Sequence, residues 1–168
     1  SSVRSPTLAT LTAASLAQLV NVIAPIMTEP GGPAWRQTTF FPFSLTSTLV
    51  RDVALELKLD SPTYETELYG DVPVVDAVAT HDADGAGTTV FAVNRSLTEE
   101  VTLEIDTLSL SGISRAQATS LFDDDIHAAN TLADPDRVRP KENTSVDLGE
   151  GTVRITLPPV SWTVLTLE

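Results

Sequence analysis

The amino-acid sequence predicts a mostly β protein, in which an antiparallel β-sandwich follows a short segment of α/β type. Two observations predict this fold class. Beyond about residue 52, short apolar or alternating segments recur between turn residues with no helical pattern between them, which is typical of a sandwich. Before that point, apolar residues follow helical spacing on either side of one short apolar run. We therefore divide the chain into residues 1–51 and residues 52–168.

The first expected element is an amphipathic helix over residues 8–23. Apolar residues recur there near the i, i+3, i+4 spacing of one helix face, and alanines between them favour the helix. Pro25 ends this helix at or before Ala24, because a proline restricts the residue before it to extended conformations.

A short strand and a second helix are expected next. Residues 24–28 predict a buried strand, and the Pro-Gly-Gly-Pro run over residues 30–33 predicts a turn. Thr38 or Thr39 then begins a helix that reaches about Val50. One helix–strand–helix unit leaves apolar faces uncovered. Either the rest of the chain packs on these faces, or most of an α/β domain lies outside this sequence. In the second case we expect the sequence to begin inside a longer protein.

The strands expected in the sandwich cover residues 53–59, 72–79, 88–94, 100–105, 116–122, 145–148, 152–157 and 161–167. An Asp- and Gly-rich turn is expected over residues 81–87, and a long loop over residues 123–144. Aromatic residues make up only 5% of the chain and are concentrated before Tyr69. We therefore expect the sandwich core to be aliphatic.

Composition excludes several classes of function. A net charge of −13 argues against nucleic acid and anionic membranes as partners, because phosphate binding needs clustered lysine and arginine. Cysteine is absent, which excludes disulfides and thiolate chemistry, and two histidines far apart do not predict a metal cluster. No apolar run approaches the roughly 20 residues of a membrane span. We expect no metal, no cofactor, no nucleic acid and no membrane partner.

The segment over residues 21–43 is the strongest candidate for a site. Trp35 and Gln37 follow the glycine-rich turn, and such groups at the end of a buried strand are how α/β barrels build sites. Glu29 is the one acid whose place at a strand end resembles a site. The alternative is that the aromatic residues of this segment only close a core. A second candidate, Asp123-Asp124-Asp125, has the oxygen ligands calcium prefers, but a solvated acidic turn explains it better because no ligand loop with spaced acids follows.

Several of these stretches resemble the α-L-arabinofuranosidases of glycoside hydrolase family 51. The resemblance is most specific in LAQLVNVIAPI over residues 16–26, in the Met27-Thr28-Glu29 and WRQT runs, and in Pro42-Phe43. It continues, less specifically, in FAVNRS from Phe91, in Ala129-Asn130-Thr131 and in LPPVSW from Leu157. It covers about Ser15 to Glu168. It implies a jelly-roll-like β-sandwich at the C-terminus, preceded by the last helix–strand–helix unit of a (β/α)8 barrel.

The resemblance also implies retaining hydrolysis of terminal α-L-arabinofuranosyl groups from arabinan, arabinoxylan and their oligosaccharides. Both catalytic glutamates of the family lie upstream of the AQLVNVIAP stretch, so we expect no catalytic residue in this chain and no activity from it alone. Gln37 matches a glutamine that contacts arabinose, Trp35 is expected to line the same pocket, and Glu29 is expected to support it. The remainder of the barrel, a hexameric assembly and a cytoplasmic location are further implications. The alternative is a non-catalytic carbohydrate-binding or structural module.

Overall fold

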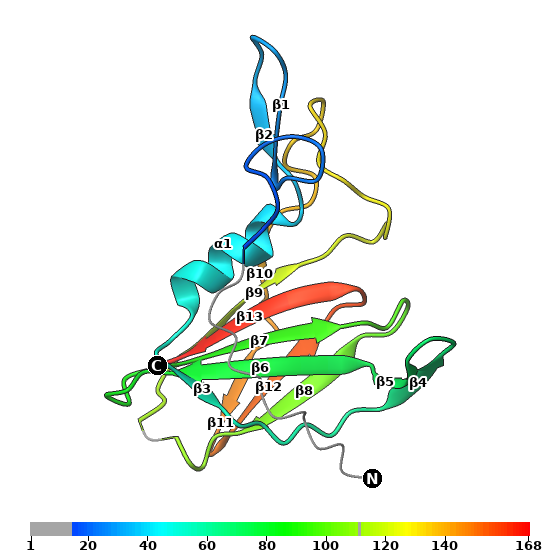
Figure 1. Cartoon of the computed structure of the whole chain (residues 1–168). Coiled ribbons are helices and arrows are strands. Elements are labelled where there is room, and N and C mark those ends of the chain that lie inside the picture. The colour runs from blue at the N-terminus through cyan, green and yellow to red at the C-terminus, as the bar shows by residue number, and fades with distance from the viewer. Residues whose placement is uncertain (1–14, 111) are drawn as a thin grey trace.

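The computed structural model describes residues 15–110 and 112–168, and two antiparallel sheets face each other in this part of the chain (Figure 1). The larger sheet has the strand order β10-β9-β13-β7-β6-β3. Its strands are β3 (Val53–Leu55), β6 (Val75–His81), β7 (Thr88–Asn94), β9 (Ala116–Leu121), β10 (Lys141–Glu142) and β13 (Ser161–Leu167). The smaller sheet has the order β11-β12-β8, made of β8 (Val101–Asp106), β11 (Asp147–Gly149) and β12 (Thr152–Leu157).

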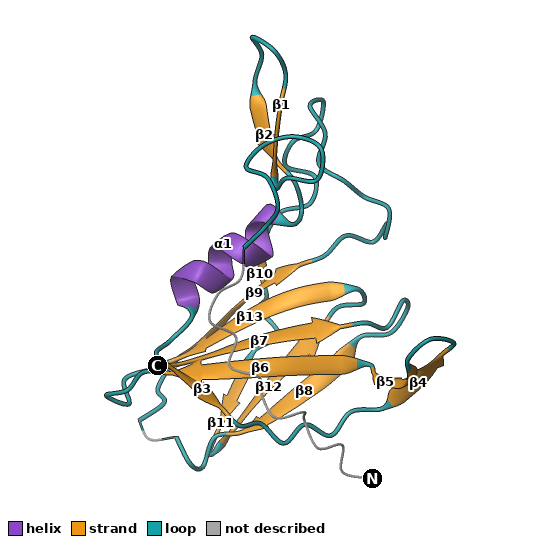
Figure 2. Cartoon of the chain, viewed as in Figure 1, coloured by secondary structure: helices purple, strands orange, loops and turns teal. Residues whose placement is uncertain are grey.

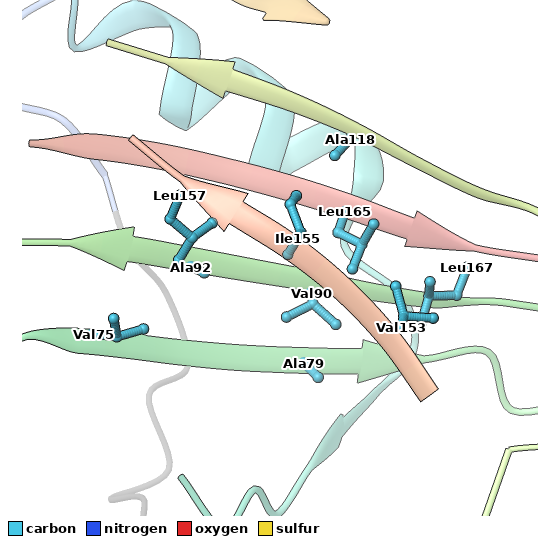
Figure 3. Packing of buried hydrophobic residues seen from close by; sticks show 10 residues of the cluster. All are labelled: Val75, Ala79, Val90, Ala92, Ala118, Val153, Ile155, Leu157, Leu165 and Leu167. Carbon is cyan, nitrogen blue, oxygen red and sulfur yellow. The ribbon is translucent and has the colours of Figure 1, made fainter. Parts of the chain in front are cut away.

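The core between the two sheets is aliphatic, as expected. On β12, Val153, Ile155 and Leu157 are each at most 1% exposed, while Arg154 between them faces solvent. This period of two places every second side chain of the strand in the core. Figure 3 shows these three side chains directed at the larger sheet, where they meet Val75, Ala79, Val90, Ala92, Ala118, Leu165 and Leu167.

The helix α1 (Phe40–Leu49) packs on the outer face of the larger sheet near β9 and β13, as Figure 2 shows. Phe41 on the helix is buried in a second apolar cluster with Leu121 of β9 and Val138, and the half-buried Trp162 packs against this cluster. The interpretation of the aromatic segment as core therefore holds for Phe41. It does not hold for Phe43, which is 45% exposed.

The predicted second helix is confirmed. Thr39 is the N-cap residue, although its side chain makes no capping hydrogen bond, and Val50 is extended, so the helix ends there. Pro42 lies in the first turn, where a missing N–H leaves no helical bond unmade.

The predicted strand over residues 24–28 forms as β1 (Ile26–Thr28), but in a different setting. It pairs in antiparallel register with β2 (Ala34–Arg36), with Met27 opposite Trp35, across the predicted turn. Gly31 takes a φ of 67° in that turn, a conformation in which glycine avoids the Cβ clash. The strand is half-buried rather than buried, because only one neighbour covers it in the part of the chain the model describes.

The helix predicted over residues 8–23 is wrong where it can be checked. Residues 15–23 form bends and turns, and residues 8–14 lie outside the described residues. Gln18, Asn21 and Val22 have φ between 57° and 63°, which a right-handed helix does not allow. The apolar side chains also stay uncovered, with Leu19 at 78% and Val22 at 80% exposed. Helical spacing stabilises a helix mainly through packing of its apolar face, and here that face has no cover.

The strand predictions for residues 88–94, 152–157 and 161–167 match β7, β12 and β13 without any shift. Three others are shorter or divided. The strand from residue 53 ends at Leu55, and the strand expected from residue 145 begins at Asp147. The stretch 72–79 is divided at Val74 into the end of one strand, at Pro73, and the start of another. A hairpin of β4 (Thr63–Thr66) and β5 (Gly70–Pro73) was not predicted, and the long loop contains β10.

Among the described residues, no helix is long and apolar enough to cross a membrane.

Candidate functional site

Trp35 and Gln37 meet at one main-chain carbonyl. The indole Nε1 of Trp35 and the amide Nε2 of Gln37 each donate a hydrogen bond to the carbonyl oxygen of Asn130, both at 3.2 Å. The two residues are two positions apart, so they project to the same side of the extended backbone. The structure therefore brings together the two side chains that were predicted to bind substrate, and both are half-buried.

The side chain of Asn130 fixes this carbonyl. It is 2% exposed, and its Nδ2 donates to the main-chain oxygens of Arg36 at 3.0 Å and Val138 at 2.9 Å. Its Oδ1 accepts a hydrogen bond from the N–H of Val138 at 2.8 Å. One buried residue thus ties the hairpin β1–β2 to the loop between β9 and β10, which lie side by side in Figure 1.

Arg36, between the two candidate binding residues, has a different environment. Its Nη2 lies 3.4 Å from Asp136 Oδ1, and its guanidinium lies 5.2 Å from the centre of the Phe41 ring and 5.8 Å from that of Phe40. The two charged side chains are each more than half exposed, so this pair stabilises little. These residues line a shallow groove of about 400 Å³ between the helix and the loop.

Glu29 is not brought to this cluster. It is exposed at the turn of the hairpin, where its N–H donates to the Pro33 carbonyl at 3.2 Å and its own carbonyl accepts from Gly32 at 3.0 Å. Gln37 lies beyond the opposite end of the hairpin, where its N–H donates to the Pro25 carbonyl at 2.8 Å. The predicted supporting role of Glu29 remains a prediction, now with the whole hairpin between it and Gln37.

Two asparagines that sequence reasoning did not select organise this region. Asn21 Nδ2 donates to Thr28 Oγ1 at 2.9 Å, and Asn21 Oδ1 accepts from the Thr28 N–H at 2.7 Å, so Asn21 braces β1. Asn130 acts on the other strand. Asn130 has no local sequence signal of this role, because it contacts residues more than 90 positions away. Asn21 acts over seven positions, but apolar spacing does not indicate a polar side-chain contact.

A second groove, of about 550 Å³, lies at the end of the sandwich. It is lined by residues from the strand ends and the loops, among them Phe122, Asp123, Asn143, Ser145, Pro158 and Val160. Lys141 Nζ lies 5.3 Å from the centre of the Phe122 ring and so covers the one aromatic side chain in this lining. Stacking on a sugar requires an accessible aromatic ring face. This groove is large enough for a sugar, but Lys141 lies over its one aromatic ring.

The negative charge of the acidic turn over residues 123–125 is partly offset by Arg137. Arg137 Nη2 lies 3.4 Å from Asp123 Oδ1 and 3.2 Å from Asp125 Oδ2, and Asp123 Oδ1 also accepts the Asp125 N–H at 2.9 Å. These contacts lower the pKa of Asp123, chiefly through the Asp125 N–H and secondly through Arg137. The arrangement is that of a solvated turn closed by an arginine, and within the described residues no group of acids and histidines is placed to hold a metal ion.

The lowered pKa leads to a testable prediction. We expect Arg137→Ala to raise the pKa of Asp123, yet to leave it below the usual aspartate range, because the Asp125 N–H remains. The carboxylate is stabilised in the folded state, so its contribution to stability is present above about pH 4 and is lost as the pH falls through the lowered pKa. Carboxyl carbon chemical shifts measured during an acid titration report the midpoint directly. An unchanged midpoint in the variant would show that Arg137 does not act on this carboxylate.

Comparison with known proteins gives one consistent family. The family model described as the alpha-L-arabinofuranosidase C-terminal domain matches residues 9–161. An exo-alpha-(1->6)-L-arabinofuranosidase from Bifidobacterium longum is 54% identical over 156 residues, covering 91% of this chain and 30% of that protein. An intracellular exo-alpha-(1->5)-L-arabinofuranosidase from Streptomyces lividans is 49% identical over 152 residues, covering 90% of this chain and 23% of that protein.

A solved structure agrees with the fold. The structure of a family 51 alpha-L-arabinofuranosidase from Bifidobacterium longum superposes with a TM-score of 0.81 at 43% sequence identity. The superposition covers 90% of this chain and 30% of that one. The chain thus spans about a third or less of the length of these relatives, and the matches include residues before the sandwich as well as the sandwich itself.

Proposed function

Because the chain belongs to the alpha-L-arabinofuranosidase C-terminal domain family, we propose that it is the C-terminal part of a glycoside hydrolase that releases terminal α-L-arabinofuranosyl groups. The observation that supports this most directly is the match over residues 9–161, joined to relatives whose names state that activity. The substrates we propose are arabinan, arabinoxylan and their oligosaccharides.

In this proposal residues 1–51 complete a catalytic (β/α)8 barrel, and residues 52–168 form the sandwich that braces it. Retaining hydrolysis needs two carboxylates about 5–5.5 Å apart, one as acid/base and one as nucleophile. Glu29 is the only acid near Trp35 and Gln37 in the sequence, and it lies at the far end of the hairpin. Asp136, an acid that the fold brings nearby, is paired with Arg36 at 3.4 Å. As the family resemblance implies, both catalytic carboxylates then come from the remainder of the barrel.

In this proposal, Trp35 and Gln37 line one side of the substrate-binding pocket. Trp35 offers an aromatic surface, and Gln37 offers amide hydrogen bonds to sugar hydroxyl groups. A neutral hydrogen bond of this kind contributes about 0.5–1.5 kcal/mol. Support for this role comes from the position of both side chains on one side of the backbone, in a segment that hydrogen bonds to the buried Asn130 hold in place.

The proposal also covers location and assembly. Several relatives carry the word intracellular in their names, which favours a cytoplasmic location. A homo-oligomer, hexameric in the resemblance described above, is proposed for the whole enzyme. Apolar side chains left open on the described surface, such as Leu19, Val22 and Ile23, are suited to being covered by the rest of the barrel or by another subunit.

An assay on two proteins tests the proposed function. We expect the purified 168-residue chain to release no product above background from a chromogenic α-L-arabinofuranoside, whereas the longer polypeptide that includes it turns the substrate over. Turnover by the short chain would overturn the assignment of both catalytic carboxylates to the remainder of the barrel. An inactive longer polypeptide would overturn the proposed reaction itself.

The binding-module alternative makes a different prediction for the short chain. It requires retention on insoluble arabinan or arabinoxylan, which we do not expect. Phe91 is only 7% exposed, Trp162 packs against the apolar cluster beneath α1, and Lys141 lies over Phe122. The most exposed aromatic rings of the described sandwich are instead Tyr64 and Tyr69 of the β4–β5 hairpin, at 40% and 81%. A pull-down that retains the chain would favour the alternative.

A further inference from the structure

We propose that Asn130 is a positioning residue for substrate binding, whose main-chain carbonyl sets the direction in which the Gln37 amide faces. The proposal rests on the proposed function, since it assigns the orientation of a side chain to a sugar contact. It adds a role for the sandwich, because Asn130 lies in the loop between β9 and β10, outside the barrel segment.

The chemistry of the contact fixes the amide. A carbonyl oxygen can only accept hydrogen bonds, so the side of the Gln37 amide that faces Asn130 must be the NH2 group. Oε1 lies in the same amide plane, across the Cγ–Cδ bond from Nε2, and therefore points away from the Asn130 carbonyl. One N–H of Gln37 is used by this bond. Among the hydrogen bonds of the described residues, the second N–H and the two lone pairs of Oε1 are not used, so they can pair with hydroxyl groups, which both donate and accept.

The carbonyl is itself held from both ends of its peptide plane. On one side, the buried Asn130 side chain bonds Arg36 and Val138, as described above. On the other side, the N–H of Thr131, which belongs to the same peptide group, donates to the Asp134 carbonyl at 3.1 Å. Rotation of this peptide plane breaks bonds at both ends. The acceptor that Trp35 and Gln37 share is therefore preorganised, which is what precise positioning of a binding group requires.

A second buried asparagine provides a matched control. Asn94 is also 2% exposed, and its Nδ2 donates to the carbonyls of Glu99, Leu157 and Pro158 while its Oδ1 accepts from Ser96. Asn94 lies on β7 and has no contact with Trp35 or Gln37 among these hydrogen bonds. Asn130→Ala and Asn94→Ala should therefore destabilise the fold to a similar degree, but only the first should loosen the Trp35 and Gln37 pair.

The first test uses the 168-residue chain and needs no activity. The sequence contains two tryptophans, so nuclear magnetic resonance shows two indole N–H signals, from Trp35 and Trp162. We expect Asn130→Ala to make hydrogen exchange of the Trp35 indole about fivefold faster, as for the loss of one hydrogen bond. The Trp162 signal serves as the internal reference for a folded chain. Asn94→Ala should leave the Trp35 signal unchanged, and Asn130→Ser, which keeps one donor, should give a smaller effect and serves if the alanine variant does not fold.

The second test measures kinetics in the longer, active polypeptide. We expect Asn130→Ala to lower kcat/KM roughly three- to tenfold, about the value of one hydrogen bond, and Asn94→Ala to leave it within about twofold. A residue that acts through Gln37 should also lose most of its effect when Gln37 is already alanine. The double variant Asn130→Ala/Gln37→Ala should therefore be less impaired than the product of the two single losses.

Each result decides a separate question. An unchanged Trp35 signal in folded Asn130→Ala, equal kinetic losses from the two asparagine variants, or losses that multiply with Gln37→Ala would each overturn the positioning role. Absence of arabinofuranosidase activity in the unsubstituted longer polypeptide would instead overturn the proposed function. The indole measurement would still report whether Asn130 fixes Trp35.

Discussion

Replacing Leu157 by alanine is expected to lower the free energy of unfolding by about 2–5 kcal/mol. Leu157 is 0% exposed at the end of β12, opposite Val101 of β8, and its side chain is directed at the larger sheet (Figure 3). The core around it is aliphatic and lies between two sheets whose backbones are fixed by hydrogen-bonded ladders. The neighbours can therefore fill the vacated volume only in part, and the cost of a cavity adds to the loss of buried apolar surface.

Urea unfolding followed by circular dichroism measures this effect. The midpoint should move to lower urea while the slope of the transition stays constant, because the surface exposed on unfolding hardly changes. Leu68→Ala is the control, since Leu68 is 84% exposed in the turn between β4 and β5. It should shift the free energy of unfolding by no more than about 0.5 kcal/mol. Equal shifts for the two variants would mean that Leu157 is not part of a close-packed core.

The sequence predicted correctly those elements whose local apolar pattern and flanking residues indicate a single type of secondary structure. Strands β7, β12 and β13 are continuous or alternating apolar runs bounded by turn residues, and the helix α1 has a threonine before it and an extended residue after it. For such elements, burial of the apolar face agrees with local propensity. The chain therefore has no competing arrangement that satisfies the same residues.

The predictions failed where tertiary contacts, and not local sequence patterns, determine the conformation of the backbone. Residues 15–23 have helical spacing, but their main chain is bent by Asn21, which accepts the Ala24 N–H and braces Thr28 through its side chain. Polar side-chain bonds of this kind compete with a helix and cannot be read from apolar spacing. The hairpin β4–β5 leaves Tyr64 and Leu68 exposed. Because it has no buried apolar face, its sequence shows no alternation that would predict two strands.

The candidate site divides in the same way. Trp35 and Gln37 could be selected from their place after the turn and from the family resemblance, and the structure brings the two together. Their partner Asn130 could not, because the contact spans more than 90 residues and uses a main-chain carbonyl, which every residue has. Glu29 was selected for its place at a strand end, but antiparallel pairing turns that end away from Gln37.

Replacing Gln37 by alanine in the longer, active polypeptide is expected to lower kcat/KM about 10- to 100-fold, which corresponds to the loss of two sugar hydrogen bonds at about 0.5–1.5 kcal/mol each. The fold should tolerate the change, since Gln37 is half-buried and Asn130 still accepts the Trp35 indole N–H. Gln37→Glu should be at least as impaired, because a carboxylate cannot donate to the Asn130 carbonyl and would face it with a second acceptor.

Gln117→Ala is the matched control for this prediction. Gln117 is exposed on β9, and its contact with Thr166 uses only its main-chain oxygen, so its side chain can be removed without loss of a hydrogen bond among those of the described residues. Rates for the three variants should be compared at a temperature where circular dichroism shows each to be folded. If Gln37→Ala and Gln117→Ala both remain within about twofold of the unsubstituted enzyme, less than the loss of even one hydrogen bond to substrate, Gln37 does not contact the sugar. The hydrogen bond to Asn130 would then serve only to fasten the hairpin to the sandwich.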